Sequence, residues 1–71
     1  MEKDICKSFG GRIRKLRTHN NWSQEQLSEA TDFHRTYIGM IERGERNPSL
    51  KSIKRFAVAF KISISELFTE L

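Results

Sequence analysis

Apolar residues recur at helical spacing near the start of the chain. Four of them are separated by intervals of four, four and three positions, which places them on one face of a helix that we expect to end at about Thr18. These four are Ile5, Phe9, Ile13 and Leu16. Gly10 and Gly11 lie within this segment, and each weakens a helix by about 1 kcal/mol relative to alanine. Either the first turn frays there or a neighbouring helix packs closely against the glycines.

Three later helix starts share a capping pattern. Ser23 is followed by Gln26, and Ser63 by Glu66, which is the spacing of a capping box. A third start is indicated at His34. At each start an apolar residue precedes the cap and can pack on one in the next turn; the pairs are Trp22 with Leu27, Phe33 with Ile38, and Ile62 with Leu67. The pattern therefore predicts helices that begin at residues 23, 34 and 63.

One more helix is predicted between the second and third of these starts. Residues 44–49 contain Gly, Asn and the only Pro, a composition typical of a loop, and Ser49 can cap the helix that follows. The apolar stripe of that helix consists of Leu50, Ile53, Ala57 and Phe60, with Phe56 beside it. No segment alternates apolar and polar residues for long enough to indicate a strand. The pattern therefore predicts an all-α fold.

Residues 23–43 have the pattern of two short helices joined by a tight turn. Only Thr31 and Asp32 separate them, which forces two amphipathic helices to cross at a steep angle and share one small core. This is a helix-turn-helix, whose second helix enters the major groove of DNA. We expect residues 1–71 to form a single domain of this kind, with the helix-turn-helix at about 23–43 and a terminal helix at about 63–71.

The distribution of charge is compatible with DNA binding. The 71 residues carry a net charge of +4. Lys and Arg outnumber Asp and Glu by six to two in residues 1–22 and by five to three in residues 45–71, whereas residues 23–44 have two against four. Positive charge thus lies on both sides of the helix-turn-helix, as expected if these flanking segments contact DNA phosphates. The alternative is that the basic residues form an ordinary solvated face.

Length and composition argue against an enzyme. A chain of this size folds near the lower limit for independent stability and has little room for a substrate cleft. Cys6, His19 and His34 lack metal-ligand spacing, and no nucleophile has a recognisable base, so we expect no catalytic residue, metal or cofactor. The lone cysteine and the lack of a long apolar run or secretory signal lead us to expect a cytoplasmic protein with no membrane partner.

The second helix of the helix-turn-helix carries candidates for base reading. If Ile38 and Ile41 face the core, the opposite side turns towards a major groove and holds Arg35, Thr36, Gly39 and Met40. Arg35 is the best candidate because its guanidinium can bridge O6 and N7 of guanine; the alternative is a solvated arginine paired with Asp32. Gly39 either clears space where helix and DNA are closest or is a tolerated weak position. His34 is either an exposed, neutral cap or a phosphate or base contact.

Phosphate contacts are expected around the ends of these helices. Gln24 lies in the first turn of the helix that begins at residue 23. Free N–H groups and the positive end of the helix dipole attract a phosphate there. Three polar residues follow the helix that begins at residue 34: Arg43, Arg46 and Asn47. They either hold the DNA backbone or are ordinary polar loop residues. Tyr37 lies between the two faces, so its hydroxyl can reach a phosphate while its ring packs inward; plain core packing is the alternative.

The last segment predicts a dimer. Its apolar residues exceed what a short helix can hide in its own domain; they are Ile62, Ile64, Leu67, Phe68 and Leu71. The alternative is that all of them complete the monomer core. Function favours a dimer as well, because one helix touches few base pairs, whereas a two-fold dimer reads half-sites about 34 Å apart.

Several of these residues together resemble the lambda repressor/Cro-like (XRE-type) helix-turn-helix family. The resemblance covers nearly the whole chain and is carried by Phe9-Gly10, Ile13 to Arg17, Trp22-Ser23-Gln24, Leu27, Tyr37-Ile38, Ile41-Glu42-Arg43-Gly44 and Asn47-Pro48-Ser49-Leu50. Within that family, the chain is similar to the small controller proteins of restriction–modification systems. This similarity is carried by Arg35 to Ile38, Ile41 to Arg43 and Arg46-Asn47. Phage-type repressors and antitoxins or other protein-interaction modules share the scaffold and are the alternatives.

This resemblance implies properties beyond those that the residue pattern predicts. It implies five compact helices, a homodimer built largely on the last helix, and binding of double-stranded operator DNA at paired half-sites. It also implies a structural ion pair between Arg17 and Glu42, autoregulation, timed expression of a nuclease gene, and contact with RNA polymerase at some sites. Two positions depart from the family pattern: Asp32 replaces the usual turn glycine, and His34 replaces the usual Ser, Thr or Asp cap.

Overall fold

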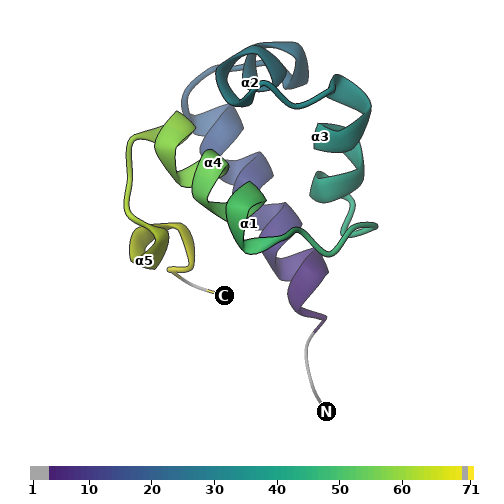
Figure 1. Ribbon diagram of the computed structural model, residues 1–71, viewed down its shortest axis with the longest axis vertical. Coiled ribbons are helices and arrows are strands. Elements are labelled where there is room, and N and C mark those ends of the chain that lie inside the picture. The colour runs from purple at the N-terminus through teal and green to yellow at the C-terminus, as the bar shows by residue number, and fades with distance from the viewer. Residues whose placement is uncertain (1–3, 70) are drawn as a thin grey trace.

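The described part of the computed structural model, residues 4–69 and 71, contains five helices and no strand (Figure 1). They are α1 (Ile5–His19), α2 (Gln24–Thr31), α3 (Arg35–Glu42), α4 (Leu50–Phe60) and α5 (Ile64–Leu67). In Figure 1, α2 lies across the top of the molecule and α3 descends beside α1 and α4. The all-α fold with a helix-turn-helix is thus confirmed.

Side-chain caps begin all five of these helices. Both predicted capping boxes, at Ser23 and Ser63, form with two reciprocal hydrogen bonds each, and Ser49 accepts from the Ser52 N–H. Asp4 caps α1 by accepting from the Cys6 and Lys7 N–H groups, which the sequence pattern did not indicate. Because each cap satisfies N–H groups that lack a partner inside the helix, these polar residues fix where the helices start.

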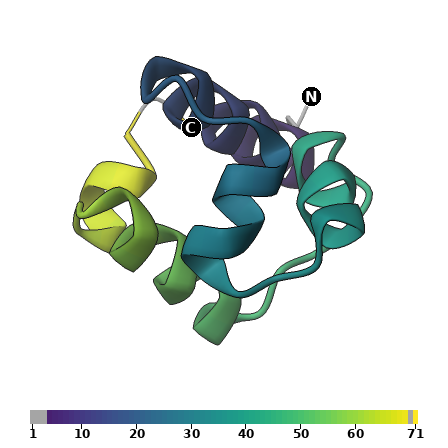
Figure 2. The ribbon, with the colours of Figure 1, turned by 90° about the horizontal axis from the view of Figure 1, so that it is seen from above.

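Asp32 makes the sharp turn between α2 and α3. Its backbone has φ 67° and ψ 17°, the left-handed region that Asp tolerates better than most residues because its short polar side chain bonds locally. The prediction that the turn survives without glycine is therefore confirmed. Figure 2, seen from above, shows the connection that leaves α2 and reverses into α3.

The core lies where the first four helices and the end of α5 converge. Its buried residues are Phe9, Ile13, Leu27, Ile38, Ile41, Phe56, Ala57, Phe60 and Leu67. Aromatic contacts tie the layers together: Phe56 meets both Phe9 and Phe33, with ring centroids 6.0 and 5.3 Å apart, and Trp22 stacks on Phe60 at 5.7 Å. Two members of the predicted stripes are not covered, since Ile5 is 60% exposed and Leu50 is 74% exposed.

Gly10 allows α1 to touch the end of α3. A Cβ on Gly10 would overlap the Ile41 carbonyl oxygen and stand 2.8 Å from the Glu42 carbonyl oxygen, whereas a Cβ on Gly11 would meet nothing within 4 Å. Of the two explanations for this glycine pair, close helix packing therefore applies to Gly10. Gly11 is exposed and serves no such contact.

The terminal segment is built into the monomer rather than projecting from it. Leu67 is completely buried, and Ile62, Ile64 and Leu71 are partly buried against the core. The prediction that Leu67 forms a dimer interface is wrong, because no surface of its side chain is left for a partner. Arg12 of α1 holds this end of the chain through its Nε and Nη2, which donate to the carbonyl oxygens of Leu67 (3.2 Å) and Glu66 (2.9 Å).

The two adjacent glycines provide a direct test of this packing. Gly10→Ala should destabilise the fold by about 1–3 kcal/mol, because backbone must move to admit the new methyl group. Gly11→Ala is the matched control and should stabilise the fold by roughly 0.5–1 kcal/mol, because alanine loses less entropy in a helix. Urea unfolding of both variants measures the difference; equal stabilisation by the two would contradict a close α1–α3 contact.

Candidate nucleic-acid interface

An ion pair between Arg17 and Glu42 links α1 to the end of α3. Arg17 Nε and Nη2 lie 2.6 and 3.1 Å from the two carboxylate oxygens, and the side chains are only 12% and 4% exposed. Arg17 Nη1 also donates to the Trp22 carbonyl oxygen at 2.8 Å, just before α2. The pair that the resemblance implied is thus present, and it joins α1, the entry to α2 and the end of α3.

Gln24 adds a third side chain to this network. Its Nε2 donates to Glu42 Oε1 at 3.1 Å, so one amide hydrogen is directed inward rather than out to a phosphate as the sequence suggested. The side chain is half-buried at the start of α2. Gln24 therefore connects the start of α2 to the Arg17–Glu42 ion pair at the end of α3.

The two faces of α3 are sorted largely as predicted. Ile38 and Ile41 are buried, whereas Arg35 and Thr36 are exposed and Met40 is half-buried. Gly39 does not lie bare on the outer face. A Cβ there would stand 3.1 Å from Arg43 Nη1 and 3.8 Å from Gln24 Oε1, so these two side chains cover it.

Arg35 extends from the first residue of α3 towards α2. Its Nη1 lies 3.8 Å from Glu25 Oε2, and the two side chains are 66% and 70% exposed. The predicted alternative partner, Asp32, is not the carboxylate that it meets. Glu25 was missed by sequence reasoning because only the crossing of α2 and α3 brings these positions together.

His34 is the cap of α3. Its Nδ1 accepts a hydrogen bond from the Thr36 N–H at 3.1 Å, and the imidazole is exposed. A nitrogen that accepts must carry a lone pair, so this cap uses the neutral ring with its proton on Nε2. The first of the two predicted roles is therefore present, and Nε2–H remains as an outward donor.

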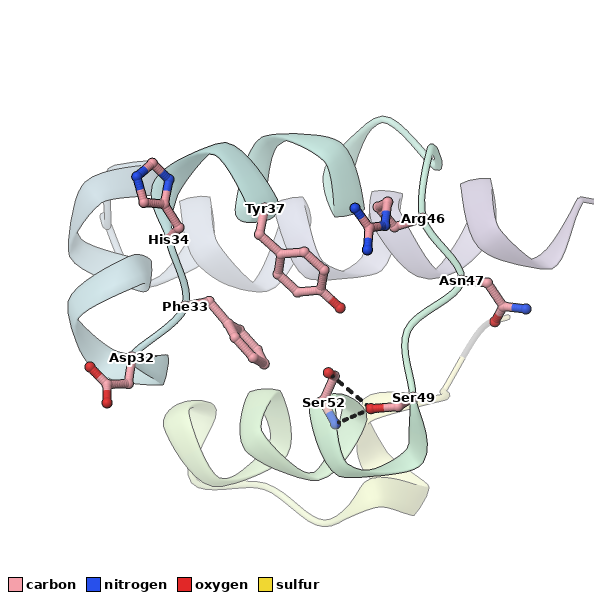
Figure 3. A pocket seen from close by; sticks show the side chains of 8 residues that line it. All are labelled: Asp32, Phe33, His34, Tyr37, Arg46, Asn47, Ser49 and Ser52. Atoms are coloured by element: carbon pink, nitrogen blue, oxygen red, sulfur yellow. Dashed lines mark hydrogen bonds between the residues drawn. The ribbon is translucent and has the colours of Figure 1, made fainter.

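Polar groups surround an open pocket between α3 and α4 (Figure 3). Its lining comprises Asp32, Phe33, His34, Tyr37, Arg46, Asn47, Ser49 and Ser52. The Tyr37 ring packs on Phe33 with centroids 4.8 Å apart, while in Figure 3 its hydroxyl turns towards Ser52. Tyr37 thus combines core packing with a polar group at the surface. Ser52 was not among the predicted site residues.

The two arginines after α3 have different partners. Arg46 lies over the Tyr37 ring, with its Cζ 5.5 Å from the centroid, and its Nη1 is 4.0 Å from the Met40 sulfur. Arg43 instead donates from Nε and Nη2 to the Glu45 carboxylate at 3.0 and 3.2 Å. These hydrogen bonds lower the pKa of the Glu45 carboxyl, and they raise the pKa of the exposed Arg43 guanidinium. The charge of Arg43 is therefore partly neutralised by Glu45.

An apolar groove opens on another side of the molecule. It is lined by Ile5, Cys6, Phe9, Asn47, Pro48, Ile53 and Phe68. Phe68 is 37% exposed, and Ile5 is the more exposed of the two at 60%. Of the five residues predicted for a dimer interface, Phe68 is thus the one with a substantial apolar surface outside the monomer core.

Two features of other protein classes are absent from the described residues. Nowhere in residues 4–69 and 71 do three His, Cys, Asp or Glu side chains gather in a way that could hold a metal ion. None of the five helices is long and apolar enough to cross a membrane.

Comparison with known proteins identifies the family. A helix-turn-helix family model matches residues 13–67. The chain is 44% identical over 66 residues to the control protein C.SmaI of Serratia marcescens, covering 93% of this chain and 79% of that protein. The crystal structure of the restriction–modification controller protein C.AhdI from Aeromonas hydrophila superposes with a TM-score of 0.88 at 42% identity, covering 93% of this chain and all of that one.

A third relative has been solved together with DNA. The controller protein C.Esp1396I, as a tetramer in complex with its natural 35-base-pair operator, matches with a TM-score of 0.85 at 30% identity, over 94% of this chain and 88% of that chain. The chain therefore belongs to the helix-turn-helix family and, within it, to the restriction–modification control proteins.

Glu42 is the residue whose loss tests the supporting network. Glu42→Ala should lower the free energy of unfolding by about 3–5 kcal/mol, because it leaves the buried Arg17 guanidinium without its counter-charge. Glu29→Ala on the exposed side of α2 is the control and should change stability by less than about 0.5 kcal/mol. Thermal and urea unfolding report both; a Glu42 variant as stable as the wild type would refute a structural role for the pair.

Proposed function

We propose that the protein is a sequence-specific transcription regulator that binds double-stranded operator DNA as a homodimer on paired half-sites. One observation carries the proposal: α3 is held from behind by the Arg17–Glu42 pair and turns Arg35 and Thr36 outward beside the start of α2. This arrangement suits insertion of α3 into a major groove. Membership of the control-protein family makes operators of restriction–modification genes the expected targets.

In this proposal, base reading comes from the first turns of α3. The Arg35 guanidinium bonds O6 and N7 of guanine, and Thr36 contacts a thymine methyl or a neighbouring phosphate. Met40, one turn after Thr36, adds apolar contact. Nε2–H of His34 supplies a donor to a base or phosphate while Nδ1 continues to cap the helix. Gly39 contributes by leaving room for the Arg43 and Gln24 side chains on this face.

Phosphates are bound on both sides of the inserted helix. The N-terminal turn of α2, with the free amide hydrogen of Gln24, faces one backbone segment. Tyr37, Arg46 and Asn47 face another from the pocket between α3 and α4. Arg43 joins them after exchanging Glu45 for a phosphate. Because the Arg46 guanidinium is already stacked on Tyr37, it loses less conformational freedom on binding than a free arginine.

The homodimer in this proposal uses the apolar groove instead of Leu67. Phe68 and Ile5 expose apolar area beside Pro48 and Ile53, and the covering of such an area by a second copy removes it from water. The groove is lined by residues near the start of α1, in the loop before α4, on α4 and just after α5. A two-fold pairing there places two copies of α3 for two half-sites.

Regulation would then follow protein concentration. Dimers form as the protein accumulates, occupy operators upstream of its own gene and of a nuclease gene, and so delay nuclease expression. Contact with RNA polymerase accounts for activation at a suitably placed site. In this proposal the protein acts in the cytoplasm as a regulator, not an enzyme, and needs no cofactor.

The decisive experiment is capture of genomic DNA by the purified protein. Fragments of the source genome bound at physiological salt should be enriched in partly palindromic sequences upstream of the protein's own gene and a neighbouring nuclease gene. Arg35→Ala should remove the enrichment, since the guanine contact provides about 1–3 kcal/mol of discrimination per site. Enrichment elsewhere would indicate a phage-type repressor, and none by the wild type would shift the function to a protein partner.

Phe68 is the residue that tests the dimer surface. Phe68→Asp should give a folded monomer with operator affinity lowered at least about tenfold, because a charge would replace apolar area at the interface. Val58→Asp is the matched control, since Val58 is 62% exposed on α4 and does not line the groove. Sedimentation velocity measures the association state; a Phe68 variant that remains dimeric would exclude this surface.

A further inference from the structure

Glu25 and Arg35 face each other across the helix-turn-helix. Glu25 lies in the first turn of α2, Arg35 is the first residue of α3, and Glu25 Oε2 is 3.8 Å from Arg35 Nη1. We propose that Glu25 is a specificity-determining residue: it positions the Arg35 guanidinium for guanine and withholds it from phosphates. This inference rests on the proposed function and concerns how the same site selects its DNA.

Folding stability does not explain the pair. Both side chains are highly exposed, at 70% for Glu25 and 66% for Arg35. Ion pairs of this kind are screened by water and salt and contribute little to stability. Affinity for DNA does not explain it either, since a carboxylate on a DNA-facing surface repels phosphates. The acid therefore lowers general attraction to DNA beside the proposed reading arginine, which is the effect expected of a residue that favours selectivity.

The chemistry of the guanidinium allows Glu25 and guanine to be bound together. A guanidinium carries five N–H donors in a planar fork, and the contact to Glu25 involves Nη1. The remaining donors are available to two acceptors on one base edge. A carboxylate on the α2 side restricts the directions in which the long side chain can extend, so less conformational freedom is lost when it meets guanine.

Selectivity follows from the difference between right and wrong sequences. At a guanine, Arg35 satisfies O6 and N7 while it stays near Glu25. At another base pair, an unrestrained arginine could turn to a phosphate and recover much of the binding energy. Glu25 competes with that phosphate and adds repulsion of its own, so binding to wrong sites is weakened more than binding to the right one.

A neighbouring acid on the same helix provides the control. Glu29 lies one turn after Glu25 on α2, and both line the same shallow pocket beside Arg35. Glu25→Gln and Glu29→Gln therefore remove the same charge from the same surface. Only Glu25 forms the ion pair with Arg35 within the described residues, so the two variants separate positioning of the guanidinium from general charge.

The test is selection from randomised duplexes long enough for two half-sites, followed by affinity measurements on selected and scrambled duplexes. Glu25→Gln should lower the ratio of selected to scrambled affinity by about three- to tenfold per half-site, with the loss confined to the guanine read by Arg35. Glu29→Gln should raise both affinities together and leave base preference unchanged. Thermal unfolding should be the same for wild type and both variants.

Other outcomes would overturn the inference. If Glu25→Gln selects the guanine as strongly as the wild type, Glu25 does not position Arg35, while the proposed function stands. If Glu25→Gln has the same effect on selectivity in an Arg35→Ala background, Glu25 acts through another group. A wild-type protein that selects no sequence at all would reject the proposed function, and the inference with it.

Discussion

The buried ion pair between Arg17 and Glu42 is the interaction on which the position of α3, the proposed DNA-reading helix, depends. It connects α1 to the last residue of α3, and through the Trp22 carbonyl and the Gln24 amide it reaches the entry to α2. Its two side chains are only 12% and 4% exposed, so breaking the pair is costly, and the pair favours the relative position in which the three helices are found. Gly10 acts in the same place, since its missing side chain brings α1 against the backbone of α3.

Several polar side chains of the proposed DNA-binding surface already have partners within the protein. Arg35 is near Glu25, Arg43 is bonded to Glu45, and His34 is bonded to the first turn of its own helix. Such contacts contribute little to folding because they are exposed, but they reduce the number of conformations available before DNA arrives. In the proposed complex, Arg35 and His34 keep these contacts while they bind DNA, and Arg43 exchanges Glu45 for a phosphate.

How much the sequence reveals depends on the range of the interaction. The capping boxes at Ser23 and Ser63 were predictable because their partners lie three residues away, and they set the helix starts correctly. Periodicity identified the apolar face of each helix but not what covers it, so Leu50 was wrongly placed in the core and Leu67 wrongly on a dimer surface. Glu25 was missed for a related reason, because its partner is ten positions away and is reached only across the helix crossing.

We propose that α3 reads DNA from the position in which the Arg17–Glu42 pair holds it. The most direct measurement is a crystal structure of the protein bound to its operator. We expect two copies of α3 in successive major grooves, Arg35 within hydrogen-bonding distance of guanine O6 and N7, and the Arg17–Glu42 pair unchanged. A complex in which α3 lies outside the groove, or in which the pair is broken to let α3 move, would contradict the account.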